Sequence, residues 1–342
     1  MTSTPLTTLG IFTGAMTAVA TNHWLVAWIG LETNMLAMLM LIAKPKTSRS
    51  LEATTKYFLI QAIASVLILI SSTVNVWNSG TWNLTQLYNS HSAMTMTIAL
   101  ATKMGAAPTH FWLPEVMQGS SLTSALLMST WQKIAPTVLM YTTVKNMPPS
   151  ALMTIGLLSI LVGGMGGINQ TQLRKMMAYS SISNTGWTTL MMTATPNIAL
   201  LNMLLYINIT YPAFMIMIHH STKTLLDLST MWTLTPALPF AMAFLALSTS
   251  GLPPLTGFAP KLLALKNFVE QELLVMATIA TLLSLVSLLF YLRVTHLSMM
   301  LTPPTSITTT TKWRFNHHQP TTTALFIPTA LTMTLMGPMI PH

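Results

Sequence analysis

Apolar segments of roughly 20 residues recur along the whole chain, separated by short polar breaks. Each segment, as a helix rising about 1.5 Å per residue, is long enough to cross about 30 Å of hydrocarbon. Lipid accepts only helices or closed barrels, and the alternation typical of barrel strands is absent. The pattern therefore predicts an all-α polytopic membrane protein. Its predicted transmembrane helices, about eleven, lie near residues 4–20, 23–43, 57–77, 93–116, 121–145, 150–169, 176–193, 197–219, 237–268, 273–296 and 322–340.

Two of these segments are interrupted by glycine and proline in the same pattern. The fourth reads GAAPTHFWLPE from Gly105, and the ninth reads GLPPLTGFAPK from Gly251. Both match G-x-x-P-x-x-x-x-x-P, and broken helices at corresponding positions indicate a transporter built from two repeats. Because the ninth segment comes five segments after the fourth, an odd interval, we expect the repeats to be inverted.

The polar breaks are too short to hold a separate soluble domain, so we expect one membrane domain over residues 1–342. Within it we place a first repeat at about 23–169, with the broken helix 93–116, and a second at about 176–296, with the broken helix 237–268, before a final helix at 322–340.

Basic residues between the segments lie almost entirely at one end of the predicted helices. Ten lie at that end, whereas the opposite end carries only Lys145 and Lys266. Loops on the negative side of a membrane carry the excess of Lys and Arg, so the N-terminus is predicted on that side (matrix or cytoplasm) and the C-terminus opposite. The ten residues are Lys44, Lys46, Arg49, Lys56, Arg174, Lys175, Lys223, Arg293, Lys312 and Arg314.

Composition narrows the class further. Only 6% of the 342 residues are charged, against about a quarter in soluble domains. The net charge of +9 follows the predicted topology, which favours a role in orientation over nucleic-acid binding. The absence of cysteine excludes disulfides and cysteine-ligated clusters, and the scattered histidines match no zinc motif. No basic residue precedes Lys44, which argues against a signal or transit peptide.

Four charged residues stand well inside the apolar segments: Glu32, Lys103, Lys133 and Lys261. Each costs at least about 2.5–3.5 kcal/mol at the membrane centre, so four together favour function over snorkelling or a structural ion pair. Burial and neighbouring charges shift the pKa of a lysine enough for it to load and release protons near neutral pH. One unit charge ~4 Å away contributes about 4 kcal/mol at an effective dielectric of 20, comparable with moving a proton against ~180 mV. We therefore predict a proton-carrying series.

Other polar features have competing interpretations. His110 lies in the fourth segment, either as a relay between Lys103 and Lys133 or as a hydrogen-bonded core histidine. Glu115 is interpreted as a residue that ends the fourth segment or pairs locally. The glycines of GGMGG at 163–167 indicate close helix packing, because neither a preceding strand nor a following Lys-Ser/Thr supports nucleotide binding.

Five stretches carry a family resemblance. They closely resemble the mitochondrially encoded, antiporter-like membrane subunits of NADH-ubiquinone oxidoreductase, respiratory complex I, which are related to subunits of sodium/proton antiporters. The likeness runs over essentially the whole chain and implies inverted five-helix repeats, each with a discontinuous helix, and eleven helices as in the animal form. The stretches are NHWLVAWIGLETNMLAML (22–39), EATTKYFLIQA (52–62), ATKMGAAPTHFWLPEVMQG (101–119), WQKIAP (131–136) and STSGLPPLTGFAPK (248–261).

The resemblance implies a role for each buried charge. Glu32 would couple to a neighbouring subunit, Lys103 would be its pairing lysine, Lys133 the central lysine and Lys261 the terminal lysine on the output side. The implied activity is proton translocation driven by electron transfer from NADH to ubiquinone. No cofactor is expected in this chain; NADH, FMN, iron–sulfur clusters and ubiquinone would belong to other subunits of the enzyme.

The resemblance also implies partners and a location. We expect the mitochondrial inner membrane, with the N-terminus in the matrix and the C-terminus in the intermembrane space. The expected partners are other membrane subunits of the complex, with subunit 4L on the Glu32 side and subunit 4 on the Lys261 side, as well as accessory subunits and phospholipids. No nucleic-acid partner is expected.

Two alternatives remain at this point. A self-contained cation/proton antiporter would use the same lysines and broken helices, but Glu32 is the only predicted buried carboxylate, and hard cations prefer several oxygen ligands. A structural membrane scaffold with vestigial charges would tolerate neutralisation of Lys133 without loss of proton pumping.

Overall fold

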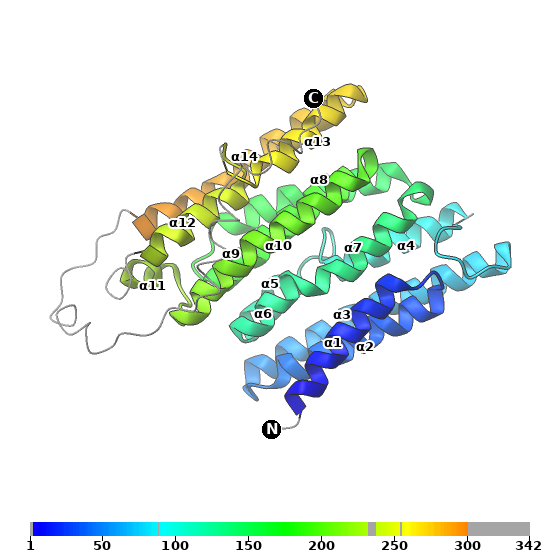
Figure 1. Ribbon diagram of the computed structural model, residues 1–342, viewed down its shortest axis with the longest axis horizontal. Coiled ribbons are helices and arrows are strands. Elements are labelled where there is room, and N and C mark those ends of the chain that lie inside the picture. Colours follow the sequence, from blue (N-terminus) through cyan, green and yellow to red (C-terminus); the bar gives the residue numbers. More distant parts are fainter. Residues whose placement is uncertain (1–2, 88, 232–236, 254, 300–342) are drawn as a thin grey trace.

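A computed structural model of the chain describes residues 3–87, 89–231, 237–253 and 255–299 (Figure 1). Within these ranges the chain forms helices and no β-strand. The elements are α1 (Ser3–Ala20), α2 (Trp24–Ala43), α3 (Ser48–Ser79), α4 (Ser90–Met104), α5 (Trp112–Gly119), α6 (Leu122–Ser129), α7 (Trp131–Thr143), the short 3-10 helix η1 (Val144–Asn146), α8 (Pro149–Ile168), α9 (Leu173–Ala194), α10 (Pro196–His219), α11 (Leu225–Thr230), α12 (Ala237–Ser250), α13 (Phe258–Glu270) and α14 (Leu274–Met299).

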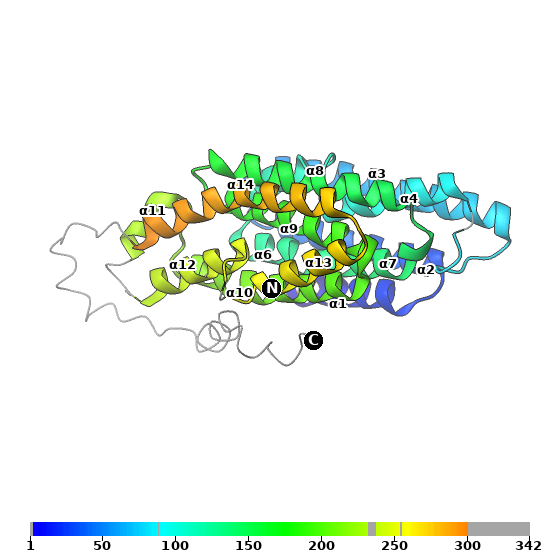
Figure 2. The ribbon, with the colours of Figure 1, turned by 90° about the horizontal axis from the view of Figure 1, so that it is seen from above.

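The long helices lie side by side in an array that follows the sequence. Figure 1 shows α1–α3 along one edge, α8–α10 in the middle and α12–α14 along the opposite edge. Seen from above, α3, α8 and α14 run along one face, and α1, α10 and α13 along the other (Figure 2). Five helices in the described part of the chain, α2, α3, α8, α10 and α14, are long and apolar enough to cross a membrane. The chain is therefore a multi-pass membrane protein.

The predicted segments and the observed helices differ at two places. The third helix begins at Ser48 rather than near residue 57, because Thr47 and Ser50 form a reciprocal capping box that satisfies the first free backbone N–H groups. The fifth segment, expected as one helix, is divided at Thr130 into α6 and α7. The predicted final helix at 322–340 lies outside the described residues.

Glycine ends the first half of each broken helix. Gly105 follows α4 with φ 76°, and Gly251 follows α12 with φ 84°. Both values lie in the left-handed region, which glycine adopts without the strain that a Cβ would bring. The chain resumes as α5 at Trp112 and as α13 at Phe258. The Gly/Pro pattern therefore marks true interruptions of helical structure.

The break at Thr130 has a different cause. The Thr130 hydroxyl donates to the carbonyl of Leu126 at 2.7 Å, and the Lys133 N–H turns back to the Thr130 carbonyl at 3.3 Å, as in a tighter 3-10 turn. Pro136, one turn further, has no N–H to donate. Lys133 therefore enters α7 at a point where the regular hydrogen-bond ladder is weakened on both sides.

The apolar core forms two clusters, one toward each end of the helices. One includes Met35, Trp112 and Phe214 and lies toward the end with most basic residues, which we call the basic end. The other includes Trp24 and Phe268 and lies toward the opposite end. Along α9 and α10, and across each broken helix, the chain passes from one cluster to the other.

The GGMGG segment packs α8 against its neighbours, as the sequence predicts. A Cβ at Gly163 would lie 2.5 Å from the backbone nitrogen of Ser183 in α9. A Cβ at Gly167 would lie 2.7 Å from the ring of Phe290 in α14. Both approaches are closer than a side chain allows, so these glycines set the distance between the helices.

We expect Gly163→Leu to lower the thermal midpoint of the solubilised protein. Forcing α8 from the backbone of α9 overpacks the interface at a cost of about 1–3 kcal/mol or more. Met165→Leu is the matched control, because Met165 is an exposed apolar residue on the same helix. Thermal unfolding measured by intrinsic tryptophan fluorescence checks the difference. Equal midpoints for the two variants would contradict the close-packing role.

Candidate functional site

A polar layer crosses the middle of the bundle between the two apolar clusters. Lys133, for example, lies between Met128 of the basic-end cluster and Ala135 of the opposite one. Lys103 and Lys261 stand at the same boundary on the two broken helices, and so does Glu32 on α2. The structure thus places all four predicted charges at one depth of the molecule.

Lys103 and Lys133 line the same small cavity, which we call the inner chamber. It has a volume of about 20 Å³, enough for one water molecule. Asn34, Gln61 and Gln132 supply further polar groups to its wall. Helices α2, α3, α4 and α7 therefore bring two of the predicted lysines to one polar space, although these lysines lie in different segments of the sequence.

Lys133 is almost completely buried, with 2% of its surface exposed. Its Nζ donates a hydrogen bond to the carbonyl oxygen of Ser181 in α9 at 2.9 Å. The same atom lies 5.6 Å from the centre of the Tyr206 ring, within the range of a cation–π contact. The two ion pairs of the described residues both involve Lys56, so no carboxylate neutralises Lys133 there.

Lys103 lies in the last turn of α4 and is 7% exposed. Its ammonium makes no hydrogen bond or ion pair to the described residues and faces the inner chamber. The C-terminal end of a helix favours a cation, because its last carbonyl groups carry partial negative charge. Glu32 interacts electrostatically with Lys103 without forming an ion pair in the described structure.

Glu32, predicted as a buried carboxylate, is partly buried. Two residues further along α2, Asn34 pairs with Gln132, the neighbour of Lys133. The two side-chain amides exchange hydrogen bonds of 3.0 and 2.8 Å. This reciprocal pair joins the helix that carries Glu32 to the helix that carries Lys133.

Lys261 faces a second polar cavity, also of about 20 Å³, which we call the distal chamber. The lysine is partly rather than fully buried. Its Nζ donates to the carbonyl of Ser250 at 2.7 Å, at the end of α12, and lies 5.8 Å from the ring centre of Trp187. A Cβ at Gly251 would lie 2.9 Å from this nitrogen, so glycine at the break leaves room for the lysine.

Tyr206 on α10 connects the two regions. It is 5% exposed, its ring lies beneath Lys133, and it also lines the distal chamber together with Asn184, Asn202 and Lys261. The sequence analysis missed Tyr206 and both asparagines. Their signal is weak, because a single polar residue in an apolar helix is also compatible with ordinary packing.

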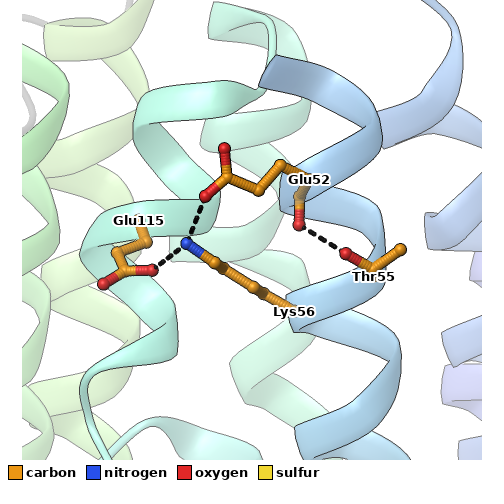
Figure 3. Close-up of polar contacts among 4 residues, drawn as sticks. All are labelled: Glu52, Thr55, Lys56 and Glu115. Carbon is orange, nitrogen blue, oxygen red and sulfur yellow. Dashed lines mark hydrogen bonds and ion pairs between the residues drawn. The ribbon is translucent and has the colours of Figure 1, made fainter. Parts of the chain in front are cut away.

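The remaining candidates lie apart from the inner chamber. His110 is 6% exposed, and its Nδ1 lies 3.2 Å from the carbonyl oxygen of Pro108. It is not among the residues of the inner chamber, so a relay role stays a prediction. Glu115 pairs with Lys56 at 2.6 Å, as in the local-pairing interpretation (Figure 3). Within the described ranges, no group of three His, Asp or Glu side chains is arranged to hold a metal ion.

Comparison with known proteins agrees with this architecture. The family model described as NADH:quinone oxidoreductase/Mrp antiporter, transmembrane, matches residues 21–287. NADH-ubiquinone oxidoreductase chain 2 from Salmo salar is 46% identical over 91% of this chain and 88% of its own. The protein of the same name from Equus asinus is 41% identical over 97% of this chain and 95% of its own length.

Solved structures show the same fold. A chain of respiratory complex I from Thermus thermophilus is 27% identical with a TM-score of 0.82, covering 95% of this chain and 77% of that one. A chain of the Mrp complex from a Dietzia species shares the fold, with a TM-score of 0.79 and 18% sequence identity. The match covers 88% of this chain and 61% of that one.

We expect the single variants Asn34→Leu and Gln132→Leu each to destabilise the protein more than the double variant. A single change leaves one buried amide unpaired, at a cost of about 1–3 kcal/mol, whereas removing both partners leaves neither amide unsatisfied. Thermal midpoints of the wild type, both single variants and the double variant form a double-mutant cycle. Strictly additive effects would show that the two amides do not depend on one another.

Proposed function

Because the chain belongs to the NADH:quinone oxidoreductase/Mrp antiporter family of transmembrane proteins, we propose that it translocates protons as a membrane-arm subunit of respiratory complex I. The energy would come from electron transfer between NADH and ubiquinone in other subunits. The observation that supports this most directly is the pair of buried lysines, Lys103 and Lys133, facing one chamber without a carboxylate ion pair among the described residues.

The surroundings of Lys133 suit a group that gains and loses a proton. An isolated buried ammonium is costly, and neutralisation relieves that cost. The carbonyl of Ser181 accepts a hydrogen bond from either an ammonium or a neutral amine, so the contact at 2.9 Å survives deprotonation. The Tyr206 ring favours the charged form alone, through its contact with the cation. The site therefore supports both states of the lysine.

The polar layer defines a path for the proton. Glu32 acts on Lys103 electrostatically, and Lys103 and Lys133 share the inner chamber. From Lys133 the path continues past Tyr206 into the distal chamber and ends at Lys261. In this scheme the charge of Glu32 controls how readily Lys103 holds its proton, and each lysine passes the proton when its neighbour is neutral.

The finer organisation follows from the same proposal. We place the protein in the mitochondrial inner membrane with the basic end toward the matrix, eleven transmembrane helices and two inverted repeats around the broken helices. Its partners would be other membrane-arm subunits, with subunit 4L near Glu32 and subunit 4 near Lys261, as well as accessory subunits and phospholipids. NADH, FMN, iron–sulfur clusters and ubiquinone would be bound by other subunits.

We expect Lys133→Met to lower the number of protons pumped per electron and the coupled turnover, because methionine fills the site but carries no proton. Lys145→Met is the matched control, since Lys145 is an exposed lysine beyond the end of the same helix. Proton uptake and NADH oxidation are measured in membrane vesicles. A native gel stained for NADH dehydrogenase activity shows whether each variant assembles. Unchanged pumping by assembled Lys133→Met complex would overturn the proposal and favour the scaffold alternative.

A similar outcome is expected for Tyr206→Phe, in which only the hydroxyl is lost. The ring and its contact with Lys133 remain, so assembly and the inner chamber are preserved, while transfer toward Lys261 is slowed. Coupled turnover should fall by about tenfold or more, the range in which a positioned proton-transfer group contributes to rate. Tyr141→Phe is the control, because the Tyr141 hydroxyl bonds Asn197 in an exposed position. Equal turnover for both variants would remove Tyr206 from the path.

A further inference from the structure

A third hollow, larger than the two chambers, lies at the basic end, outside the path described above. It has a volume of about 310 Å³ and lies between α3, α5 and the start of α9. We call it the outer hollow. Five charged residues supply its wall, together with Gln118, Gly119 and Ala53: Arg49, Glu52, Lys56, Glu115 and Lys175. Charged side chains with this much open volume keep a space filled with solvent rather than with lipid or packed side chains.

Lys56 holds two helices together at this hollow. Its Nζ lies 2.5 Å from a carboxylate oxygen of Glu52, one turn earlier on the same helix, and 2.6 Å from one of Glu115 on α5 (Figure 3). The first contact stays within α3, and the second crosses to the short helix that follows the break at Gly105. Only the Lys56–Glu115 pair therefore ties α5 to α3 through charge.

The outer hollow and the inner chamber are lined by adjacent residues of the same two helices. On α3, Lys56 faces the hollow and the next residue, Tyr57, lines the chamber. On α5, Glu115 faces the hollow, whereas Trp112 lines the chamber three residues earlier. The two spaces are thus one residue apart along α3 and within one helical turn of each other along α5.

Two aromatic side chains stand in that separation. The rings of Tyr57 and Trp112 meet edge to face with their centres 5.7 Å apart and an angle of 61° between their planes. Tyr57 is 3% and Trp112 5% exposed. The indole Nε1 of Trp112 is buried and has no hydrogen-bond partner within the described residues. A buried donor without an acceptor costs free energy unless some state of the protein gives it one.

We propose that the outer hollow is the entrance through which protons reach Lys103 and Lys133, and that the Tyr57–Trp112 contact is the gate between them. This inference rests on the proposed proton translocation and adds to it a route of entry and a barrier. When α5 moves away from α3, the rings part and water from the hollow meets the indole N–H. A proton then passes along that water to the neutral amine of Lys103, which has no hydrogen bond to the described residues to break first. The Lys56–Glu115 pair favours the closed position.

The chain contains no cysteine, so one introduced thiol reports on the gate. Gln61→Cys places the thiol in the inner chamber, one helical turn beyond Tyr57 on α3. A charged, membrane-impermeant methanethiosulfonate reagent is applied to the assembled complex in vesicles, from each side of the membrane in turn. The rate of labelling of this chain is then read after separation on a denaturing gel.

The test compares Gln61→Cys alone with the same change combined with Glu115→Gln or with Glu52→Gln. Both added changes remove one carboxylate from Lys56, but only Glu115→Gln releases α5 from α3. We expect labelling from the basic end alone, about threefold faster with Glu115→Gln, since partly exposed ion pairs contribute little free energy. With Glu52→Gln the rate should stay close to that of Gln61→Cys.

Equal rates in the two combined variants, labelling only from the opposite end, or no labelling in any variant would each overturn the gate. If Gln61→Cys fails to assemble on a native gel, Met35→Cys offers a second position in the inner chamber. The labelling experiment does not depend on pumping. If labelling is as expected but Lys133→Met pumps fully, the proposed function is refuted, while the solvent entrance and its gate remain. If Lys133→Met fails to pump but labelling is the same with Glu115→Gln and Glu52→Gln, only the gate is refuted.

Discussion

The whole arrangement depends on the cost of holding ammonium groups in the middle of a lipid-embedded helix bundle. An uninterrupted helix uses its carbonyl groups internally, so a lysine inside one finds few acceptors. The interruptions solve this problem locally. Lys261 donates to the carbonyl of Ser250, the last residue before the break at Gly251, and Lys103 lies in the last turn before the break at Gly105. Breaks that would be faults in an ordinary membrane helix here supply the polar surroundings of the lysines.

The broken helices and the four charged residues could be predicted from the sequence, because a single charged residue in an apolar segment is already costly in hydrocarbon. The Gly/Pro pattern and the four charges stand out against an apolar background, and both breaks occur where the pattern puts them. The Asn34–Gln132 pair was not predictable, since 98 residues separate its members and each amide alone looks unremarkable. The division at Thr130 was hidden for another reason: threonine bends a helix through its own hydroxyl and carries no glycine signal.

Helix α9 contacts both Lys133 and Lys261. Ser181 accepts the hydrogen bond of Lys133, Asn184 lines the distal chamber, and Trp187 lies beneath Lys261. These three residues are spaced three apart, and each step of three falls about 60° short of a full turn. The contacts therefore shift gradually from the side of α9 that faces α7 to the side that faces α13. The close glycine contact of α8 with Ser183 fixes the same stretch from behind. A shift of α9 would therefore change the surroundings of Lys133 and Lys261 together. Rigid packing of α9 keeps its contacts with the two lysines at a fixed spacing.

A pump with an entrance at one end must also prevent protons from returning through it. Moving a gate from mostly closed to mostly open requires about 5.5 kcal/mol of bias. The Lys56–Glu115 pair is partly exposed, and such pairs supply at most about 1 kcal/mol. It can hold the gate near closure but cannot drive it. A unit charge placed or removed ~4 Å from Lys103 supplies about 4 kcal/mol at an effective dielectric of 20. In the proposed scheme most of the control would therefore come from charge changes in the polar layer, at Glu32 and Lys103. The ion pair at the hollow would set how readily α5 moves.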